Sequence, residues 1–232
     1  MLVELGGVRL LTDPVLRSHL AHLRRHGPPP TPPADVDAVL VSHVHYDHLD
    51  LPSLRRLGTH VHLVVPDGAG DFLRGAGFTA VEELAVGDAV SVGEVSVTAV
   101  RAVHDDRRRP LGLRAQPLGF LLGRRPHVYF AGDTDLFPEL AELPPVDVAL
   151  LPVAGWGPSL GHGHLDPARA ARAAALVRPR VAVPIHWGTL HPRLTRRGSW
   201  FTDPPREFEA GVAEVAPGVE VRVLAPGESL AL

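Results

Sequence analysis

Four apolar runs in this 232-residue sequence end, directly or one residue later, in histidine or aspartate. The run AVLVS at 38–42 leads into HVHYDH at 43–48, which crowds three histidines and one aspartate into six positions. Later runs lead in the same way into His104, Asp133 and His186. Because sites in α/β sheets are usually built beyond the carboxyl ends of the strands, we expect these side chains to gather at one edge.

Short runs rich in apolar and β-branched residues recur along the chain and predict the strands of a layered α/β protein. The clearest helix is predicted at 167–177, where Asp166 is a natural N-cap and Pro167 is the first helical residue. Two further helices are expected at 136–142 and 204–214. The predicted strands are 2–5, 8–11, 38–42, 61–65, 95–103, 118–122, 127–131, 147–153, 181–184 and 219–224.

The composition limits the possible chemistry. Cysteine and lysine are both absent, which excludes disulfides, thiolate ligands, cysteine nucleophiles and Schiff bases. A formal net charge of -3 offers no basic stripe for a phosphate backbone, so nucleic acid is not an expected partner. The long uncharged stretch at 148–165 is broken by proline and glycine, unlike a membrane span, and the N-terminus does not have the order of a secretory signal. We therefore expect a cytoplasmic protein without a transmembrane segment. The sequence does not determine its oligomeric state.

The spacing of the ligand-type side chains favours two metal ions over one. His43 and His45 are two residues apart and point to the same side of an extended backbone. Asp47 and His48 follow a turn and cannot easily reach the same ion. Imidazole and carboxylate ligands without thiolate favour zinc first, and manganese or iron second. The predicted first set is His43, His45 and His104, the second set is Asp47, His48 and His186, and the predicted bridge is Asp133.

These motifs resemble those of the metallo-β-lactamase fold superfamily. The matching stretches are HVHYDHLD, a histidine after a strand at 104, YFAGDTD and VPIHWGT. They are most similar to the branch that contains N-acylphosphatidylethanolamine phospholipase D and the L-ascorbate 6-phosphate lactonases. The resemblance covers nearly the whole chain and implies an αββα four-layer sandwich of mixed sheets, with a binuclear site at one edge that hydrolyses an ester, lactone or phosphodiester. The ligands it implies are His43, His45, Asp47, His48, His104, Asp133 and His186.

The resemblance also has two departures. Relatives in this branch usually begin with a further strand that ends in a Gly-His-Ala-Thr-like turn, and this sequence starts after that point. We therefore expect residues 1–232 to form one hydrolase domain, with or without that first strand. The segment DDRRRPLGLRAQP at 105–117 matches neither of the two named enzymes, so the resemblance does not identify the substrate. The first substrate class that it implies is a phosphodiester or a phosphate-bearing lactone.

Other residues are expected beside a small-molecule substrate. The resemblance places His164 of GHGHLDP near the substrate, and a plain loop position is the alternative. Trp187 and His191 follow the last predicted ligand and are expected to line the pocket. Arg107 opens the arginine run 107–109, which either contacts an anionic substrate or forms solvated surface.

The remaining histidines have structural interpretations. His19, His22 and His26 are spaced to share one face of a helix over the entrance, and ordinary surface is the alternative. The proline-rich stretch at 27–33 is expected to lead the chain around the outside of the domain. The histidines that flank or occupy predicted strands, and are interpreted as structural, are His60, His62 and His127.

The expected reaction is attack by a metal-bridging hydroxide on a carbonyl or phosphorus centre, while the second ion neutralises the developing oxyanion. Asp47 is expected to orient the attacking water, and His164 or His191 to protonate the leaving group. One alternative is a serine hydrolase, because GPSLG at 157–161 places Ser159 in a G-x-S-x-G pattern, although the next helix after Ser159 is predicted to begin only at 167. The others are a metal-binding or sensor module without turnover, and oxygen chemistry at a di-iron site.

Overall fold

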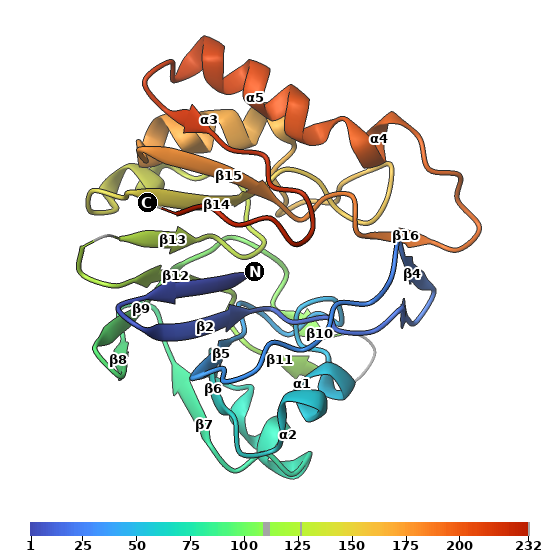
Figure 1. The fold of residues 1–232 in the computed structure, drawn as a ribbon, viewed down its shortest axis with the longest axis vertical. Helices are drawn as coiled ribbons and strands as arrows, with labels where there is room; N and C mark the ends of the chain where they lie inside the picture. Colours follow the sequence, from blue (N-terminus) through green and yellow to red (C-terminus); the bar gives the residue numbers. More distant parts are fainter. Residues whose placement is uncertain (109–111, 126, 232) are drawn as a thin grey trace.

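The computed structural model describes residues 1–108, 112–125 and 127–231. Two β-sheets stack face to face, and helices cover the outer face of each sheet (Figure 1). In Figure 1 α3 (Pro167–Val177) and α5 (Pro204–Val215) lie above the sheets, and α1 (Leu51–Leu57) and α2 (Gly70–Gly75) lie below them. The predicted αββα sandwich is therefore the fold of this chain.

The first sheet has five strands in the order β1-β2-β5-β6-β7. β1 and β2 form an antiparallel hairpin, and the other neighbours are parallel. Four of these strands match predicted runs to within two residues at each end, whereas β7 has no predicted counterpart. Their bounds are β1 (Leu2–Leu5), β2 (Val8–Thr12), β5 (Ala38–Leu40), β6 (His62–Pro66) and β7 (Val81–Leu84).

The second sheet has seven strands in the order β17-β15-β14-β13-β12-β9-β8. The pairs from β17 to β13 are parallel, and those from β13 to β8 are antiparallel. The predicted strand at 219–224 is reduced to a two-residue strand, and β8 has no predicted counterpart. The bounds are β8 (Ala89–Val92), β9 (Val95–Arg101), β12 (Leu118–Leu122), β13 (Val128–Phe130), β14 (Val148–Pro152), β15 (Val181–Ile185) and β17 (Glu220–Val221).

The main core lies between the two sheets. Leu40 of the first sheet and Phe120 of the second belong to it, and neither side chain is exposed to solvent. Because helices cover the outer faces too, strands such as β5, β12 and β14 are buried on both sides, which explains why the sequence shows continuous apolar runs in place of alternation.

Helix α3 has the predicted bounds, and local chemistry explains them. The side chain of Asp166 accepts a hydrogen bond from the backbone N–H of Arg169, and proline follows the cap. Small alanine side chains let the helix approach the sheet and α5, whose Phe208 is fully buried. The helix predicted at 136–142 is instead a 3₁₀ helix over Pro138–Glu142, and α4 (Ser199–Thr202) and α1 have no predicted counterpart.

A smaller sheet corrects one prediction. His19 lies in β3 (His19–Leu20), and β4 (Leu23–Arg25) pairs with it and with β16 (Leu190–Pro192). The helix proposed for His19, His22 and His26 is therefore wrong, because hairpin pairing satisfies the backbone here. The following stretch at 27–31 is exposed, as predicted for a segment on the outside of the protein. A second small sheet pairs β10 (Arg107–Arg108) with β11 (Leu113–Arg114).

Within the described residues, no helix combines the length and apolar character that crossing a membrane requires.

Candidate active site

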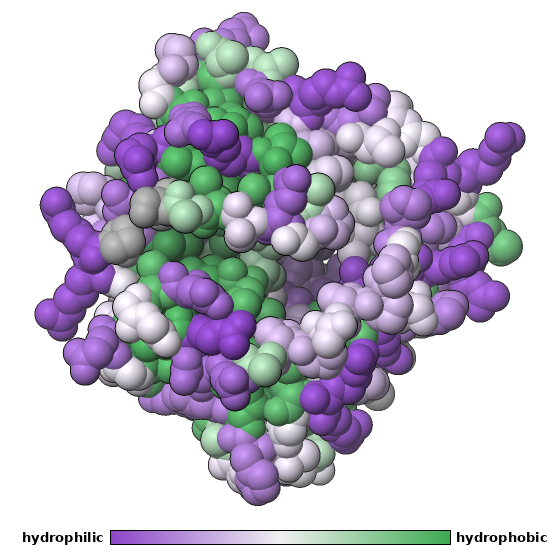
Figure 2. Space-filling view, in the orientation of Figure 1, coloured by the Kyte–Doolittle hydropathy of each residue, from purple (hydrophilic) through white to green (hydrophobic). Residues whose placement is uncertain are grey.

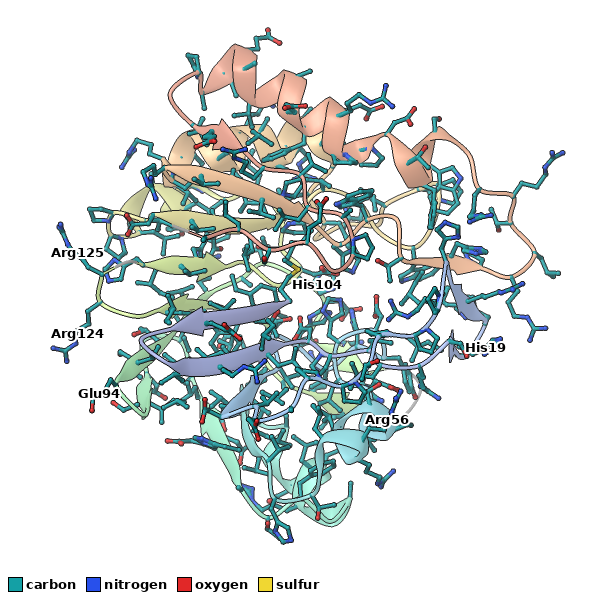
Figure 3. All side chains as sticks on the ribbon, in the orientation of Figure 1. His19, Arg56, Glu94, His104, Arg124 and Arg125 are labelled. Atoms are coloured by element: carbon teal, nitrogen blue, oxygen red, sulfur yellow. The ribbon has the colours of Figure 1, made fainter. Side chains whose placement is uncertain are left out.

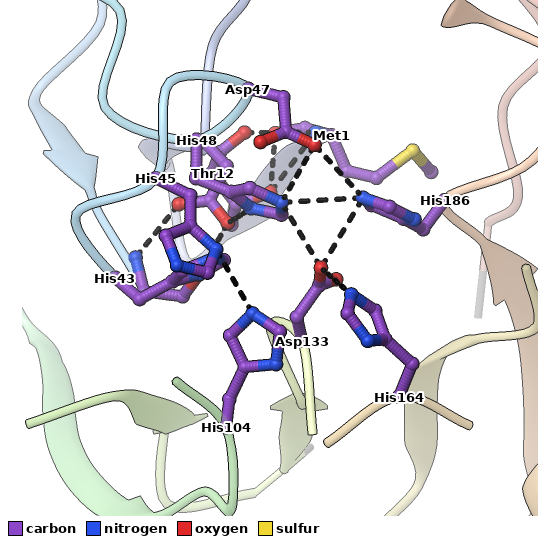
Figure 4. Close-up of polar contacts among 12 residues, drawn as sticks. Met1, Thr12, His43, His45, Asp47, His48, His104, Asp133, His164 and His186 are labelled. Atoms are coloured by element: carbon purple, nitrogen blue, oxygen red, sulfur yellow. Dashed lines mark hydrogen bonds and ion pairs between the residues drawn. The ribbon is translucent and has the colours of Figure 1, made fainter. Parts of the chain in front are cut away.

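The predicted ligands converge where strands of both sheets end. His43 follows β5, and His104 follows β9 of the other sheet. Asp133 and His186 come shortly after the parallel strands β13 and β15. Figure 4 shows these side chains, with His164, pointing toward one another from separate segments of the chain. The structure thus brings together residues up to 143 positions apart, from His43 to His186.

Three histidines form the first group. The ring centroids of His43, His45 and His104 lie 4.6–4.8 Å apart, and Nε2 of His104 is 3.0 Å from Nδ1 of His45. The Nδ1–H of His104 donates to the Gly163 carbonyl at 2.7 Å, which leaves its Nε2 lone pair directed at the group. Convergent imidazole nitrogens at this spacing can hold a metal ion.

The second group combines Asp47, His48 and His186. The Nε2 atoms of the two histidines are 3.2 Å apart, and Oδ2 of Asp47 lies 3.6 Å from each. The Nδ1–H of His186 donates to the Ala154 carbonyl at 2.9 Å, so its free nitrogen also faces the group. His186 has a left-handed φ of 61°, a strained backbone conformation of the kind found at functional sites.

Asp133 lies between the two groups. Its Oδ2 is 3.4 Å from Nε2 of both His48 and His186, and 3.6 Å from Nε2 of His164. Its Oδ1, and Nε2 of His43, are buried with no hydrogen-bond partner in the described structure. Buried polar atoms are almost always paired, and a metal ion on each side of Asp133 would supply the missing partners. The donor set therefore fits two ions.

The carboxylates and histidines shift one another's proton affinity. Burial opposes the charged form of His186, but Asp133 and Asp47 raise its pKa to about 9. The pKa of His48 is also raised, against burial, by Asp133, Asp47 and Asp13. Burial alone would raise the pKa of Asp47, but His48 and His186 lower it to about 2. In the metal-free protein His186 is therefore protonated at neutral pH, so an ion that binds there must displace a proton.

The histidines of the first group shift the other way. Burial lowers the pKa of His104 to about 4, and it lowers that of His43 well below the ordinary value. The pKa of His45 is lowered by the same cause. These imidazoles are neutral at pH 7 and are ready to act as ligands.

We expect the metal-free protein to be most stable near pH 6.5. Above this pH the unfolded chain loses its histidine protons while folded His186 keeps its own up to about pH 9, so stability falls as pH rises. Below it, the unfolded chain gains protons that folded His43 and His104 do not accept, so stability falls as pH drops. Thermal unfolding of chelator-treated protein from about pH 4.5 to 9 measures this. A melting temperature that rises steadily through this range would contradict the assigned shifts.

Asp13 is a functional candidate that the sequence reasoning missed. Its Oδ1 accepts from the Ser42 backbone N–H at 2.7 Å, and its Oδ2 accepts from the Ser42 hydroxyl at 2.6 Å and contacts Nδ1 of His48 at 2.6 Å. The carboxylate thereby fixes the tautomer of His48 that directs Nε2 into the site. Strand β5 ends at Leu40, and the Ser42 N–H just beyond it bonds to the Asp13 carboxylate and not to a neighbouring strand. The signal was available, because Asp13 directly follows β2.

Arg108 supports the ligand loop from within. Its Nη1 donates to the carbonyls of Val44 and Leu49 at 2.6 and 2.9 Å, and its guanidinium lies 3.8 Å from the ring centre of Tyr46. Only 4% of the residue is exposed. It therefore joins the two ends of the turn that carries Asp47 and His48, and is a positioning residue with no free surface for a substrate.

We predict that Arg108→Met lowers metal affinity about 10–100-fold, the usual effect of removing an outer support of a metal site. The matched control is Arg107→Met, because Arg107 is exposed and pairs with Asp106 at 3.7 Å. Competition with a chromophoric chelator measures both affinities. Equal affinities for the two variants and the parent protein would show that Arg108 does not position the loop.

The loop before α3 holds His164 in place. The Gly163 N–H donates to Asp135, whose other oxygen pairs with Arg169, and Arg169 also donates to the His164 carbonyl. A Cβ at Gly163 would lie 3.1 Å from His104 Cα, so this close approach requires glycine. The His164 ring centre is then 4.6 Å from that of His104. His164 therefore lies beside the ligand groups, and its contact with substrate and its catalytic role stay predictions.

The other predicted substrate contacts are less directly placed. Trp187 packs against the apolar cluster between the second sheet and helices α3 and α5, and its ring N–H donates to the Pro184 carbonyl at 3.0 Å. His191 lies in β16 with its ring against Phe201. Arg107 is exposed. Substrate contact by any of these three stays a prediction, and Arg109 of the same run lies outside the described residues.

The structure also bears on the three structural histidines and on Ser159. His62 lies in β6, and His60 and His127 lie just before strands. His60 contacts Thr79, His62 contacts Glu82, and His127 contacts the Pro145 carbonyl. Ser159 lies in an exposed bend, and the next helix begins eight residues later at Pro167. The strand–turn–helix elbow of a serine hydrolase is therefore not formed at GPSLG.

Known proteins resemble this chain in sequence and in fold. Residues 8–187 match the β-lactamase superfamily domain. A metal-dependent hydrolase of Methanopyrus kandleri is 33% identical over 98% of this chain and 94% of its own length. The N-acyl-phosphatidylethanolamine-hydrolyzing phospholipase D 1 of Caenorhabditis elegans is 32% identical over 82% of this chain and 61% of its own length. The solved structure of Igni18, a metallo hydrolase from Ignicoccus hospitalis, is 27% identical, has a TM-score of 0.74 and covers 99% of this chain and 92% of its own.

Sequence similarity over nearly the full chain, the sandwich fold and the convergent histidines and aspartates lead to one assignment. The chain belongs to the β-lactamase superfamily and is a metal-dependent hydrolase.

Proposed function

We propose that this chain, as one hydrolase domain, uses a binuclear metal centre to cleave an ester, lactone or phosphodiester bond. The observation that carries the proposal is the arrangement around Asp133. Two groups of three ligand atoms, each group within 4.8 Å, flank a buried carboxylate that has an unpartnered oxygen. Zinc is the first candidate ion, and manganese or iron the next, because the donors are imidazoles and carboxylates.

Two divalent ions in this site would supply a nucleophilic hydroxide at neutral pH and stabilise the charge that develops on the substrate oxygen. Asp47 has a carboxylate that remains ionised down to about pH 2, so it can accept a hydrogen bond from the attacking water and orient it. His164 is partly exposed, with 23% of its side chain accessible, and lies 3.6 Å from Asp133. It is the histidine best placed to donate a proton to a leaving group.

Phosphodiesters are the first substrate class to test, because the Caenorhabditis elegans relative is named for hydrolysing a phospholipid. Protein stripped by a chelator and reloaded with zinc, manganese or ferrous iron is assayed on bis(p-nitrophenyl) phosphate, p-nitrophenyl esters and simple lactones. We expect turnover only after reloading, and its loss in His43→Ala. Fully reloaded protein that cleaves none of these classes would favour the metal-binding module without turnover.

A further inference from the structure

One face of the protein is built from segments without acidic residues. The sheet β16-β4-β3 and the turn at 193–197 after β16 form what we name the basic sheet. They belong to segments 14–34 and 167–202, which contain no aspartate or glutamate. The chain as a whole carries a formal net charge of -3. Positive charge is thus concentrated on one face of an otherwise acidic protein.

Several arginines of the basic sheet are exposed and unpaired. Arg24, Arg193 and Arg196 are exposed, and in the part of the chain that the structure describes none of them forms an ion pair with a carboxylate. Arg17 and Arg25 differ, because they bond to Asp50 and to backbone carbonyls inside the protein. Arg17 and Arg25 are therefore held by the protein itself, whereas Arg24, Arg193 and Arg196 extend into solvent.

The strand register places two histidines beside Arg24. Arg24 of β4 pairs with His19 of β3 on one side and with His191 of β16 on the other. Directly opposite residues in antiparallel strands project from the same face, so the three form one row. Figure 3 places His19 at the right edge of the molecule, and Figure 2 shows hydrophilic side chains gathered on that side.

Two apolar side chains accompany the arginines. Leu194 lies between Arg193 and Thr195 in the turn and has a relative exposure of 101%. Trp156 is 40% exposed and touches His22 of the hairpin, with ring centres 5.2 Å apart. A dissolved anion or a nucleic acid backbone would pair with the arginines but would make no favourable contact with an exposed leucine. A bilayer with anionic headgroups uses both, because tryptophan favours the interface and leucine favours the acyl region.

The basic sheet also borders the candidate active site. Leu190, the first residue of β16, comes four positions after His186. On the other side, Arg17 pairs at 2.7 Å with Asp50, which comes two positions after His48. A surface bound by this sheet would therefore lie next to the convergent histidines.

We propose that the basic sheet docks this protein on the surface of an anionic phospholipid membrane, with Leu194 and Trp156 entering the headgroup region. Arginines near an anionic leaflet are attracted to it, and this attraction is screened by salt. The binding does not require turnover, so the docking proposal can be tested independently of the proposed function.

Vesicle sedimentation tests the docking with the full chain. The probes are vesicles of phosphatidylcholine with about 30% phosphatidylserine, and vesicles of phosphatidylcholine alone, at about 0.1 M and 0.5 M salt. We expect binding to the anionic vesicles at low salt, release at high salt, and little binding to the neutral ones. Equal binding to both vesicle types, or no binding to either, would overturn the proposal.

Matched variants locate the surface. Arg193→Glu with Arg196→Glu should weaken binding to anionic vesicles at least about tenfold. The control is Arg124→Glu with Arg125→Glu, an identical charge change at exposed residues that Figure 3 shows on the opposite side. We expect this control to bind at least half as tightly as the parent. Equal losses in the two double variants would mean that net charge, and not the basic sheet, drives the binding.

Leu194→Ser separates a membrane from a nucleic acid. We expect it to weaken vesicle binding several-fold while the salt dependence is retained. Binding of a single-stranded RNA is measured in parallel for the same variants. If RNA binds through Arg193 and Arg196, Leu194→Ser has no effect and anionic vesicles do not bind, the partner is a nucleic acid and the membrane proposal is overturned.

Discussion

Asp133→Asn is expected to reduce kcat/KM on the order of 10³-fold or more, at least the effect of removing a positioned catalytic group. Asparagine keeps the shape of the side chain but cannot hold two cations through one negatively charged group. The carboxylate lies 3.4 Å from Nε2 of both histidines of the second group, His48 and His186. It also lies within 4.8 Å of a ring nitrogen of His104 in the first group, so its charge acts on both groups. We also expect the metal content to fall, because the group that joins the two ligand sets is lost.

A titration separates this role from a general loss of structure. Asp133 is the largest cause that raises the pKa of His186 to about 9, so in the metal-free variant that pKa should move down toward the ordinary value. Asp147→Asn is the control. Asp147 is half-buried and precedes β14, which runs parallel to β13, so it lies at the edge of the sheet opposite to Asp133. Histidine resonances followed by NMR measure the shift. If Asp133→Asn keeps both parental activity and metal content, Asp133 is not the bridge.

Asp47→Ala is the second substitution with a large expected effect. We predict a fall in kcat of about 10²–10⁴-fold, because the group that orients the attacking water is removed. The change in folding stability should be small by comparison, since Asp47 is only partly buried and its charge is directed at the site. Steady-state kinetics give kcat and KM separately, and thermal unfolding of the same sample gives the stability.

The metal content of Asp47→Ala helps to interpret this result. His48 and His186 remain, so we expect the second ion to bind more weakly and the first ion, on the histidine group, to be retained. Asp135→Ala serves as the comparison, because Asp135 supports the loop of His164 and is outside both ligand groups. An Asp47→Ala protein as active as its parent would rule out the proposed water-orienting role and favour another group as the base.

The convergence of the proposed ligands could be predicted from the sequence because one rule governs where they lie. Every proposed ligand follows the end of a strand, and strands that lie side by side bring such residues together however far apart they are in the chain. His104 and His186 illustrate this, since 81 residues separate them. The same rule would have found Asp13 after β2. A Thr-Asp-Pro stretch is also typical of an ordinary turn, so these three residues alone do not mark Asp13 as part of a site.

Arg108 shows what the sequence could not reveal. Within a run of three arginines, nothing distinguishes the exposed Arg107 from the buried Arg108 until the β10–β11 pairing fixes which side chain points inward. The helix predicted for the histidines at 19–26 was wrong for a related reason. A spacing of three and four residues suits a helix, but pairing of the hairpin with β16, more than 160 positions away, determines the structure.

Helix α1 could have been predicted from its capping residue. Asp50 caps it through the Ser53 backbone N–H, and Pro52 sits in its first turn, a combination typical of a helix start. The helix is only seven residues long and directly follows the ligand loop, so its apolar periodicity is too short to recognise. Its function is to fix the end of the loop, since Asp50 also binds Arg17.

The most direct test of this account is the metal content per chain, measured by inductively coupled plasma mass spectrometry on protein purified without a metal-affinity column. The account predicts about two equivalents of zinc, manganese or iron, one for each ligand group around Asp133. Less than about one equivalent, not restored when metal is added back, would contradict the binuclear site and with it the proposed chemistry.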